Sequence, residues 1–254
     1  MSEMALVGLS QPQAFDTEQF GRPVVRLLAD IAADGGALAG RLAHEIDNWR
    51  RQGVWLASVR LPEARAEACE AELAAAGFRR IETLVSFERP TAAPPPADHP
   101  VAHPVALAAR QDWPETIEIA RTAFRYDRYH ADPLVPKAGA DRLKAAWVAN
   151  SLAGRADAVL LAKRDGRVAG FVTLMATAEA AAIDLIATAP WAQGRGIGRA
   201  LVAAALARYA EQRPLMRGAT QADNLASQRL YRGAGFVETA RQATYHRINT
   251  ELPA

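Results

Sequence analysis

A glycine-rich loop, Gln193–Arg199, holds the residues of this chain whose types and spacing are best suited to chemistry. Its three glycines occupy alternate positions between an apolar stretch, residues 182–188, and an alanine-rich stretch that begins near Arg199. A helix that starts after such a loop leaves backbone N–H groups uncovered, and its dipole favours an anion there. Glycine also lets a phosphate approach where a Cβ atom would block it. The loop therefore predicts a diphosphate-binding site, and the alternative is a turn that only joins a strand to a helix.

Two familiar kinds of phosphate loop do not fit this stretch. No Gly-Lys-Ser/Thr follows the glycines, as a P-loop would require. A dinucleotide-binding loop needs the spacing G-x-G-x-x-G early in a βαβ unit, with an acidic residue about 20 positions later. Here the spacing is G-x-G-x-G, the loop lies late in the chain, and Arg217 and Gly218 stand in that later region.

A second motif, Asn224–Phe236, follows the loop. Together the two segments resemble the GNAT superfamily of acyl-CoA N-acyltransferases. The first matches that family's Q/R-x-x-G-x-G/A pyrophosphate loop through Gln193, Gly196 and Gly198. The second matches its N-x-A-x-x-x-L-Y-x-x-x-G-F signature through Asn224, Ala226, Leu230, Tyr231, Gly235 and Phe236. Either motif alone is moderately specific, and both in this order and spacing are a strong signal.

The resemblance implies acetyl-CoA (coenzyme A) as co-substrate, no metal, and a cofactor site with two parts. One part is the strand whose backbone pairs with the pantetheine arm and whose N–H groups polarise the thioester carbonyl, matched by Ile186, Ala187 and Thr188. The other part would hold the pyrophosphate through main-chain N–H groups, with two arginines adding charge: Gln193, Gly194, Arg195, Gly196, Ile197, Gly198 and Arg199.

Two residues of the second motif receive roles from the same resemblance. Asn224 matches the asparagine that binds the cofactor arm; asparagine is also a common helix N-cap, and the two roles are compatible. Tyr231 matches the tyrosine that protonates the leaving thiolate. A phenol with an ordinary pKa of about 10 can donate a proton to a thiolate of similar basicity. The alternative for Tyr231 is an aromatic side chain packed under a helix.

The catalytic base and the acceptor site are less clearly marked. Asp184, on the strand beside the acetyl site, and Glu82, on the last strand of the first half, are candidate bases, and either could be a solvated or salt-bridged carboxylate. Arginine favours phosphate and aromatic rings favour a stacked base. One segment therefore suggests an acceptor site, with the alternative of a helix end with a solvated charged face: Arg125, Tyr126, Arg128, Tyr129 and His130.

A narrower resemblance is to the dTDP-fucosamine (dTDP-4-amino-4,6-dideoxygalactose) acetyltransferase branch of the superfamily. It rests on residues 15–21, 76–87, 124–133 and 219–245 and implies a nucleotide-activated amino sugar as acceptor. Two departures bear on the acceptor: the proline-rich stretch looks long, and Thr188 stands where a β-branched apolar residue is usual. Other acceptors therefore stay open, namely an amino acid, a polyamine, an antibiotic or a protein N-terminus. A non-catalytic acyl-CoA-binding regulator is the alternative from another class.

Composition narrows the class of protein. The net charge is +2, and the basic residues are scattered, which argues against a nucleic-acid partner. No apolar run approaches the roughly 18 residues of a membrane span, and Met1–Met4 lacks the basic start of a secretory signal. With Cys69 as the one cysteine, we expect a cytoplasmic protein without disulfides that acts on a small-molecule amine, with a homodimer left open.

Proline-rich residues 91–102 predict a linker between two domains. We expect a catalytic N-acetyltransferase domain over 103–254 and a smaller, degenerate GNAT-like α/β domain over 1–90. Gly77–Thr83 echoes Gly235–Thr239 after a helix in each half, although a chance repeat is the alternative. The fold class is α/β, the GNAT fold, with a mixed twisted sheet flanked by helices.

The expected elements follow from hydrophobic periodicity and turn residues. Helices are expected near 38–49, 62–76, 113–126, 141–151, 199–211 and 225–233. Strands are expected at 54–59, 81–87, 159–163, 168–174, 182–188, 216–220 and 237–247, with Asp165-Gly166 as the turn of a hairpin.

Overall fold

The computed structural model describes residues 9–28, 38–93 and 103–251, and they form two compact units. One unit contains the described parts of residues 1–83, 131–134 and 241–254, and the other contains those of 84–130 and 135–240. These units are interleaved along the chain, unlike the consecutive division expected from the linker. Residues 94–102 of that linker lie outside the described residues.

The larger unit is built on a mixed sheet. Its strand order is β4 (Arg79–Pro90, of which 84–90 belong here), β9 (Leu215–Gln221), β8 (Ala180–Thr188), β7 (Arg167–Ala176), β6 (Ala158–Arg164) and β5 (Val105–Leu107). Neighbouring strands are antiparallel except β8 and β9, which are parallel. The β6–β7 hairpin turns at Asp165 and Gly166 with φ of 53° and 76°, so the predicted hairpin is confirmed.

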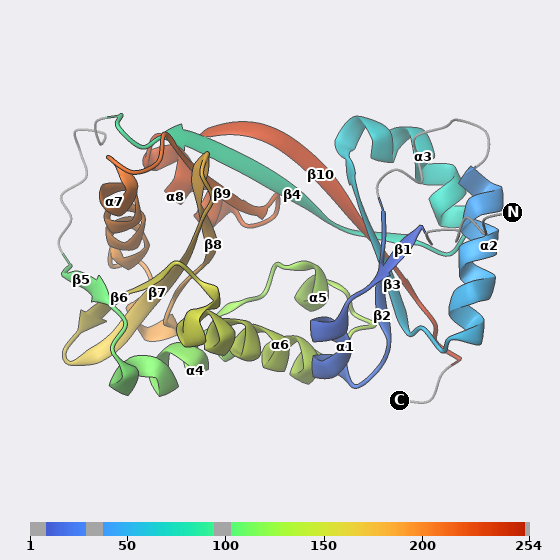
Figure 1. Cartoon of the computed structure of the whole chain (residues 1–254), viewed down its shortest axis with the longest axis horizontal. Coiled ribbons are helices and arrows are strands. Elements are labelled where there is room, and N and C mark those ends of the chain that lie inside the picture. Colours follow the sequence, from blue (N-terminus) through green and yellow to red (C-terminus); the bar gives the residue numbers. More distant parts are fainter. Residues whose placement is uncertain (1–8, 29–37, 94–102, 252–254) are drawn as a thin grey trace, which may run out of the picture. The chain divides into compact units, whose positions relative to one another are not determined.

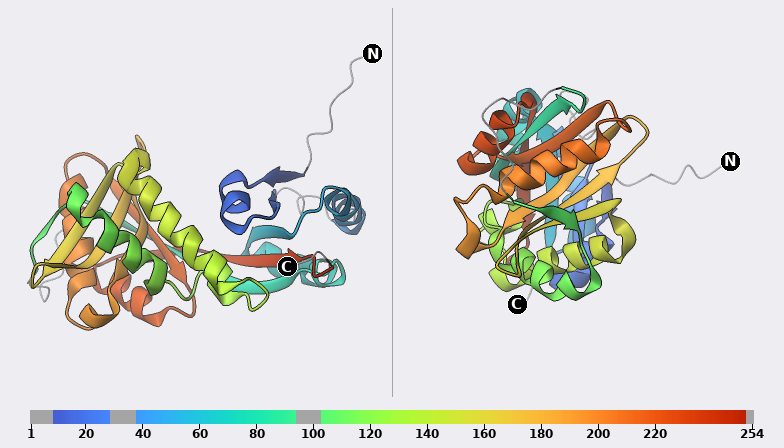
Figure 2. Two further views of the ribbon diagram at one scale, coloured as in Figure 1. Left: turned by 90° about the horizontal axis from the view of Figure 1, so that it is seen from below. Right: turned by 90° about the vertical axis from the view of Figure 1, so that its left-hand side faces the viewer.

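Helices cover both faces of this sheet. Helix α7 (Ile197–Tyr209) covers one face, and α4 (Trp113–Ala123) and α6 (Lys137–Asn150) lie side by side on the other (Figures 1 and 2). The core between them includes Phe171, Val172 and Leu201, all fully buried. The remaining elements are α5 (Arg128–Ala131), α8 (Leu225–Gly233), two 3-10 turns over Arg110–Asp112 and Pro190–Ala192, and a π-helical turn over Ser151–Arg155.

Three predicted helix boundaries in this unit differ from the structure. Helix α6 begins at Lys137 rather than near Asp141. Helix α4 ends at Ala123 rather than at Tyr126, because Phe124 adopts extended backbone angles and Asp127 accepts a hydrogen bond from the N–H of Tyr129, which favours a new turn. Helix α7 begins two residues earlier than expected, at Ile197, with Gly196 as its N-cap. Among the described residues, no helix has both the length and the apolar character needed to span a bilayer.

The smaller unit has its own sheet and core. Its strand order is β1 (Ser10–Pro12), β2 (Val24–Leu27), β3 (Leu56–Pro62) and β10 (Val237–Ile248, of which 241–248 belong here). Its helices are α1 (Ala14–Phe20), α2 (Leu38–Arg51) and α3 (Glu63–Ala75). Leu42, Trp49 and Leu73 are buried in a core of side chains from these elements. The sequence patterns predicted α2, β3 and α3 but not β1, α1 or β2.

Two strand–helix–strand repeats, β3–α3–β4 and β9–α8–β10, exchange their last strands. In the smaller unit β3 pairs with β10, from Leu56 with Ile248 to Pro62 with Gln242. In the larger unit β9 pairs with β4, from Leu215 with Pro90 to Gln221 with Leu84. Because each repeat gives its final strand to the other, the last residues of the chain group with the first ones.

Candidate functional site

The predicted diphosphate loop lies between the end of β8 and the start of α7. Gly194 and Gly196 have φ of 73° and 83°, a left-handed conformation that glycine adopts without strain. The N-cap of α7 is Gly196, which has no side chain to accept from the first N–H groups of the helix. These groups, at the positive end of the helix dipole, are therefore available to an anion.

Helix packing gives a reason for glycine at position 198, whereas the sequence analysis expected access for a phosphate group. A Cβ atom at this position would lie 3.2 Å from Cδ2 of Leu230 on α8. Gly198 therefore lets the first turn of α7 pack closely against α8, and its missing side chain points toward protein. At Gly194, by contrast, a Cβ atom would meet nothing within 4 Å.

His103 contacts the loop, and sequence reasoning missed it. Its Nε2 atom lies 2.7 Å from the carbonyl oxygen of Arg195, so the ring must donate a hydrogen bond to the loop. The same atom would be 4.0 Å from a Cβ atom at Gly196. A single histidine after a proline-rich stretch has no sequence signal for this role, because the contact joins positions 92 residues apart.

The β8 strand presents unpaired backbone beside this loop. It pairs with β7 along its length, with a bulge at Asp184. Its parallel pairing with β9 covers only Ala180–Ala182 within the described residues. Ile186, Ala187 and Thr188 lie beyond that pairing, so their peptide groups on the β9 side can pair with an extended ligand, as the edge of a sheet does.

Tyr231 lies on α8 in an aromatic cluster of the larger unit. Its ring centroid is 5.5 Å from that of Phe87 and 5.4 Å from that of Phe236, and the residue is 1% exposed. Burial raises the pKa of Tyr231 well above its ordinary value, so the phenol is protonated at neutral pH. Its hydroxyl forms no hydrogen bond with the part of the chain that the structure describes.

A glycine makes room for this ring. A Cβ atom at Gly218 on β9 would lie 2.8 Å from Cε1 of Tyr231. Phe87, the residue paired with Gly218 on β4, stacks on the same ring. A glycine inside a strand is a sequence signal for such a close approach, although the sequence analysis did not predict it for Gly218.

Asn224 is the N-cap of α8. Its Oδ1 atom accepts a hydrogen bond of 3.2 Å from the N–H of Ser227. The expected capping role is therefore present. The Nδ2 group makes no hydrogen bond with the described residues, so it is available to donate to a ligand.

The two candidate bases are both engaged in ion pairs. The Asp184 carboxylate pairs with Arg155 and accepts a hydrogen bond of 3.2 Å from Nε1 of Trp147. Because the bulge at Asp184 interrupts the alternation of the strand, its side chain need not share a face with Ile186 and Thr188.

Glu82 belongs to the smaller unit and is buried. One carboxylate oxygen, Oε1, lies 2.7 Å from Nη2 of Arg60 and 3.2 Å from Oγ1 of Thr244. The other, Oε2, is buried without a hydrogen-bond partner in the described structure. Glu82 thus keeps one oxygen without a hydrogen-bond donor in the described residues. Tyr231 and Asp184 belong to the other unit.

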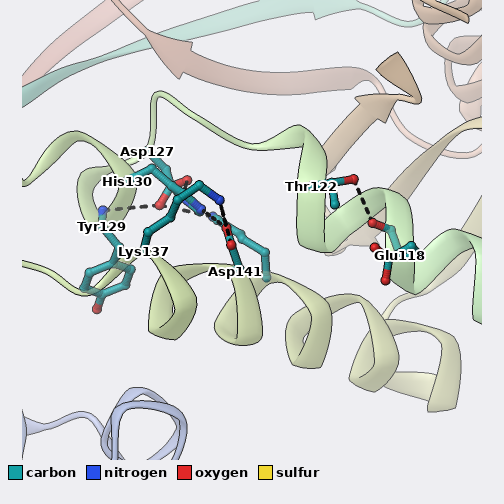
Figure 3. Close-up of polar contacts among 8 residues, drawn as sticks. Glu118, Thr122, Asp127, Tyr129, His130, Lys137 and Asp141 are labelled. Atoms are coloured by element: carbon teal, nitrogen blue, oxygen red, sulfur yellow. Dashed lines mark hydrogen bonds and ion pairs between the residues drawn. The ribbon is translucent and has the colours of Figure 1, made fainter. Parts of the chain in front are cut away.

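The predicted acceptor segment divides into exposed and buried side chains. Arg125 and Tyr126 are exposed, Tyr126 at 45%. Tyr129 is buried, and the Arg128 guanidinium lies 4.5 Å from its ring centroid. Both ring nitrogens of His130 contact carboxylates, as Figure 3 shows. Of the five predicted acceptor residues, Arg125 and Tyr126 are the ones with side chains open to solvent.

Metal binding has no support in the described part of the chain. No group of three or more His, Cys, Asp or Glu side chains there is arranged to hold a metal ion.

Comparison with known proteins matches the region that contains this site. Residues 113–236, just under half of the chain, match the acetyltransferase (GNAT) family. The spore coat polysaccharide biosynthesis protein SpsD of Bacillus subtilis (strain 168) is 32% identical over 130 residues, which cover 51% of this chain and 44% of that protein. The chain thus matches less than half the length of this curated relative.

Solved structures match over a longer part of the chain. A GCN5-related N-acetyltransferase from Sphaerobacter thermophilus has a TM-score of 0.66 at 18% identity, covering 94% of this chain and 76% of that one. A tandem GNAT protein from the clavulanic acid biosynthesis pathway has a TM-score of 0.61 at 17% identity, covering 92% and 77%. At such identities the likeness establishes the fold, and the predicted GNAT fold is confirmed.

Proposed function

Because this chain has the GNAT fold and residues 113–236 match the acetyltransferase (GNAT) family, we propose that it is an acetyl-CoA-dependent N-acetyltransferase. The observation that carries the proposal is the loop Gln193–Arg199, whose glycines and uncapped N–H groups stand at the start of α7. These features fit a diphosphate group, because an anion there meets backbone donors and no obstructing side chain. Arg195 and Arg199 add positive charge.

The residues of the larger unit have distinct roles in this proposal. When bound, acetyl-CoA supplies an activated acetyl thioester. Ile186, Ala187 and Thr188 orient the extended arm through backbone hydrogen bonds, and N–H groups of this strand polarise the carbonyl oxygen. Tyr231 donates its proton to the departing thiolate sulfur, and its raised pKa keeps that proton in place until it is needed.

The amine must lose a proton as it attacks, either to a carboxylate or to water held by one. Glu82 has a buried oxygen without a partner, whereas the Asp184 carboxylate already accepts from Arg155 and Trp147. Glu82 and Asp184 both stay candidates for this role, directly or through a water molecule.

The acceptor proposed here is a nucleotide-activated amino sugar such as dTDP-fucosamine. Two observations support this class of acceptor: the exposed pair Arg125 and Tyr126 suits a phosphate and a base, and the relative SpsD is named for polysaccharide biosynthesis. The degenerate GNAT-like nature of the first half is part of the same proposal, and the match to a tandem GNAT protein over 92% of the chain supports it.

Calorimetric titration with CoA tests the cofactor site. Arg199→Ala removes a charge beside the loop, and Arg208→Ala removes one at the other end of the same helix as a matched control. We expect Arg199→Ala to weaken CoA binding roughly ten- to hundredfold, as the loss of a charged hydrogen bond does, while Arg208→Ala has little effect. Equal losses, or none in either variant, would contradict the assignment of the loop.

The acceptor class is tested by release of free CoA from acetyl-CoA. dTDP-fucosamine, spermidine, free amino acids and a peptide N-terminus are compared at equal concentration. We expect the highest kcat/KM with dTDP-fucosamine. Turnover with another amine alone would replace the acceptor, and CoA binding without turnover on any amine would favour an acyl-CoA-binding regulator.

A further inference from the structure

His130 bridges two carboxylates in the larger unit. Its Nδ1 atom lies 2.6 Å from Oδ2 of Asp127, and its Nε2 atom lies 3.0 Å from Oδ1 of Asp141 on α6. The His130 side chain is 4% exposed. Figure 3 shows the ring between the two carboxylates, with the Lys137 ammonium group approaching Asp141 from outside.

The two contacts determine the charge of the ring. A neutral imidazole has one N–H donor, and an ionised carboxylate can only accept. With an ionised carboxylate at each nitrogen, both nitrogens must carry hydrogen, so His130 is an imidazolium. Cations also pair with both carboxylates: Lys144 lies 3.7 Å from Asp127, and Lys137 lies 2.6 Å from Asp141.

The pKa directions agree with this geometry. Burial and the charge of Lys144 would lower the pKa of His130, but the hydrogen bonds to Asp127 and Asp141 and the charge of Asp127 outweigh them and raise that pKa above its ordinary value of 6.5. Burial alone would raise the pKa of Asp127, but the charge of Lys144 and the hydrogen bond from His130 hold it below its ordinary 3.8. The pKa of Asp141 is also lowered, mainly by Lys137 and His130 acting against burial.

These directions define a pH window for the bridge. Stability contributed by a raised histidine pKa is fully present below pH 6.5 and is lost as the pH rises through the pKa of the folded state. Stability from the lowered aspartate pKa values is present above pH 3.8 and is lost as the pH falls through them. The bridge is therefore complete from mildly acidic pH up to the raised pKa of His130.

The His130 bridge anchors the end of segment 124–130, which contains the exposed acceptor-site candidates Arg125 and Tyr126. After α4 ends at Ala123, the Phe124 ring lies 5.0 Å from the Lys144 ammonium group, and three residues later Asp127 pairs with the same lysine. Arg125 and Tyr126 lie between these two contacts and point to solvent. The segment 124–130 is thus tied to α6 on both sides of this exposed pair.

We propose that His130 is a positioning residue which, as an imidazolium bridging Asp127 and Asp141, holds Arg125 and Tyr126 in place to bind the acceptor. This inference rests on the proposed function and assigns His130 a role different from direct contact with the acceptor. The side chain cannot donate to a substrate, because both of its donors are used within the protein.

The test compares His130→Gln with Lys137→Gln. Glutamine at position 130 cannot bridge both carboxylates with a charge, whereas Lys137 contacts Asp141 from a position 76% exposed and serves as the matched control. With dTDP-fucosamine, His130→Gln should raise the KM for the acceptor roughly ten- to hundredfold, as small displacements of binding groups do. The Kd for CoA and the kcat at saturation should change less than twofold in both variants.

Hydrogen exchange of the amides in 124–130 provides a readout that needs no substrate. Protection in the parent should fall as the pH rises from 6 to 9, whereas protection in His130→Gln should already be low at pH 6 and change little. Asp141→Asn, which keeps the side-chain shape, gives the same comparison if His130→Gln does not fold.

The outcomes separate this inference from the proposed function. Unchanged acceptor KM in His130→Gln, or exchange in 124–130 equal to that of the parent at pH 6, overturns the positioning role. If the parent neither binds CoA nor acetylates dTDP-fucosamine, the proposed function fails, and the exchange measurement still decides whether His130 fixes the segment.

Discussion

The two strand–helix–strand repeats, β3–α3–β4 and β9–α8–β10, end their helices in the same way. Gly77 and Gly235 have φ of 81° and 83°. The next residue is a buried phenylalanine in both, and its N–H donates to the carbonyl group five residues earlier: Phe78 to Leu73 at 2.9 Å, and Phe236 to Tyr231 at 3.0 Å. This is the Schellman closure of a helix, with glycine at the left-handed position.

The repeats differ at the positions to which chemistry is assigned. Leu73 and Tyr231 accept the same backbone hydrogen bond and are each 1% exposed, but only Tyr231 has a hydroxyl group. Helix α8 begins with the capping side chain of Asn224, whereas α3 follows Pro62 without a side-chain cap. The comparison teaches that the helix closure is structural, since it occurs without the hydroxyl, and it supports the proposal that the first half is a degenerate copy.

Of the tests of this comparison, removal of residues 1–102 should have the largest effect, which is on stability, because the second repeat would lose β4. Phe87 of that strand is fully buried and stacks on Tyr231, and β9 would be left with an unpaired edge. Loss of one buried phenylalanine side chain alone costs about 3–5 kcal/mol, out of a typical total stability of about 5–15 kcal/mol. We expect no cooperative thermal transition in a chain that starts at His103.

Coexpression with residues 1–93 is the matched control for this deletion. Because the repeats exchange strands, the two fragments should associate and restore both the thermal transition and CoA binding. Cooperative melting of the 103–254 chain by itself would show that the second repeat folds without β4 and would contradict the prediction.

The substitution Tyr231→Phe should have the next largest effect, which is on the catalytic rate constant kcat rather than on stability. The substitution keeps the ring that packs between Phe87 and Phe236 and removes only the hydroxyl group by which the two repeats differ. General acid catalysis contributes about 10²–10⁴-fold, so kcat should fall by that factor while the Kd for acetyl-CoA changes little.

The loss should shrink with an acyl donor whose leaving thiol is more acidic, because such a thiolate needs less protonation to depart. Thermal melting of Tyr231→Phe serves as the stability control. A kcat close to that of the parent would leave Tyr231 as a packing residue, equivalent to Leu73.

Gly77→Ala and Gly235→Ala should have the smallest effects and should resemble each other in stability. A non-glycine residue in the left-handed region costs about 1–2 kcal/mol, and the two turns have nearly the same φ. Chemical denaturation should therefore give similar losses. Gly235→Ala, next to the Tyr231 helix, should also lower kcat, whereas Gly77→Ala should not; a large difference in stability would show that the two turns are not equivalent.

The local parts of the fold could be predicted from the sequence, because periodicity, caps and turns are encoded by neighbouring residues. Helix α8 and the Asp165-Gly166 hairpin lie where the patterns placed them, and the loop Gln193–Arg199 follows a strand and starts a helix as expected. The exchange of β4 and β10 could not be predicted in this way, because strand partners are chosen by long-range packing.

The same limit applies to side chains in the site. His103 reaches Arg195 across 92 residues, and the sequence contains no local mark of that contact. His130 was predicted as a binding residue from its polar and aromatic neighbours, but composition cannot reveal that Asp141 lies at its second nitrogen. Polar and aromatic residue types thus singled out this segment as a candidate, and the structure separates its exposed members from its buried ones.

The exchanged strands have a consequence for how this protein is made. Leu56 on β3 pairs with Ile248, so the sheet of the smaller unit lacks one of its strands until Ile248 has left the ribosome. At about 5–20 residues per second, the 192 residues that follow Leu56 up to and including Ile248 take on the order of 10–40 s to synthesise. During that interval β3 has an open edge, and contacts so distant in sequence slow the final folding step. We therefore expect the smaller unit to complete its folding only after Ile248 has emerged.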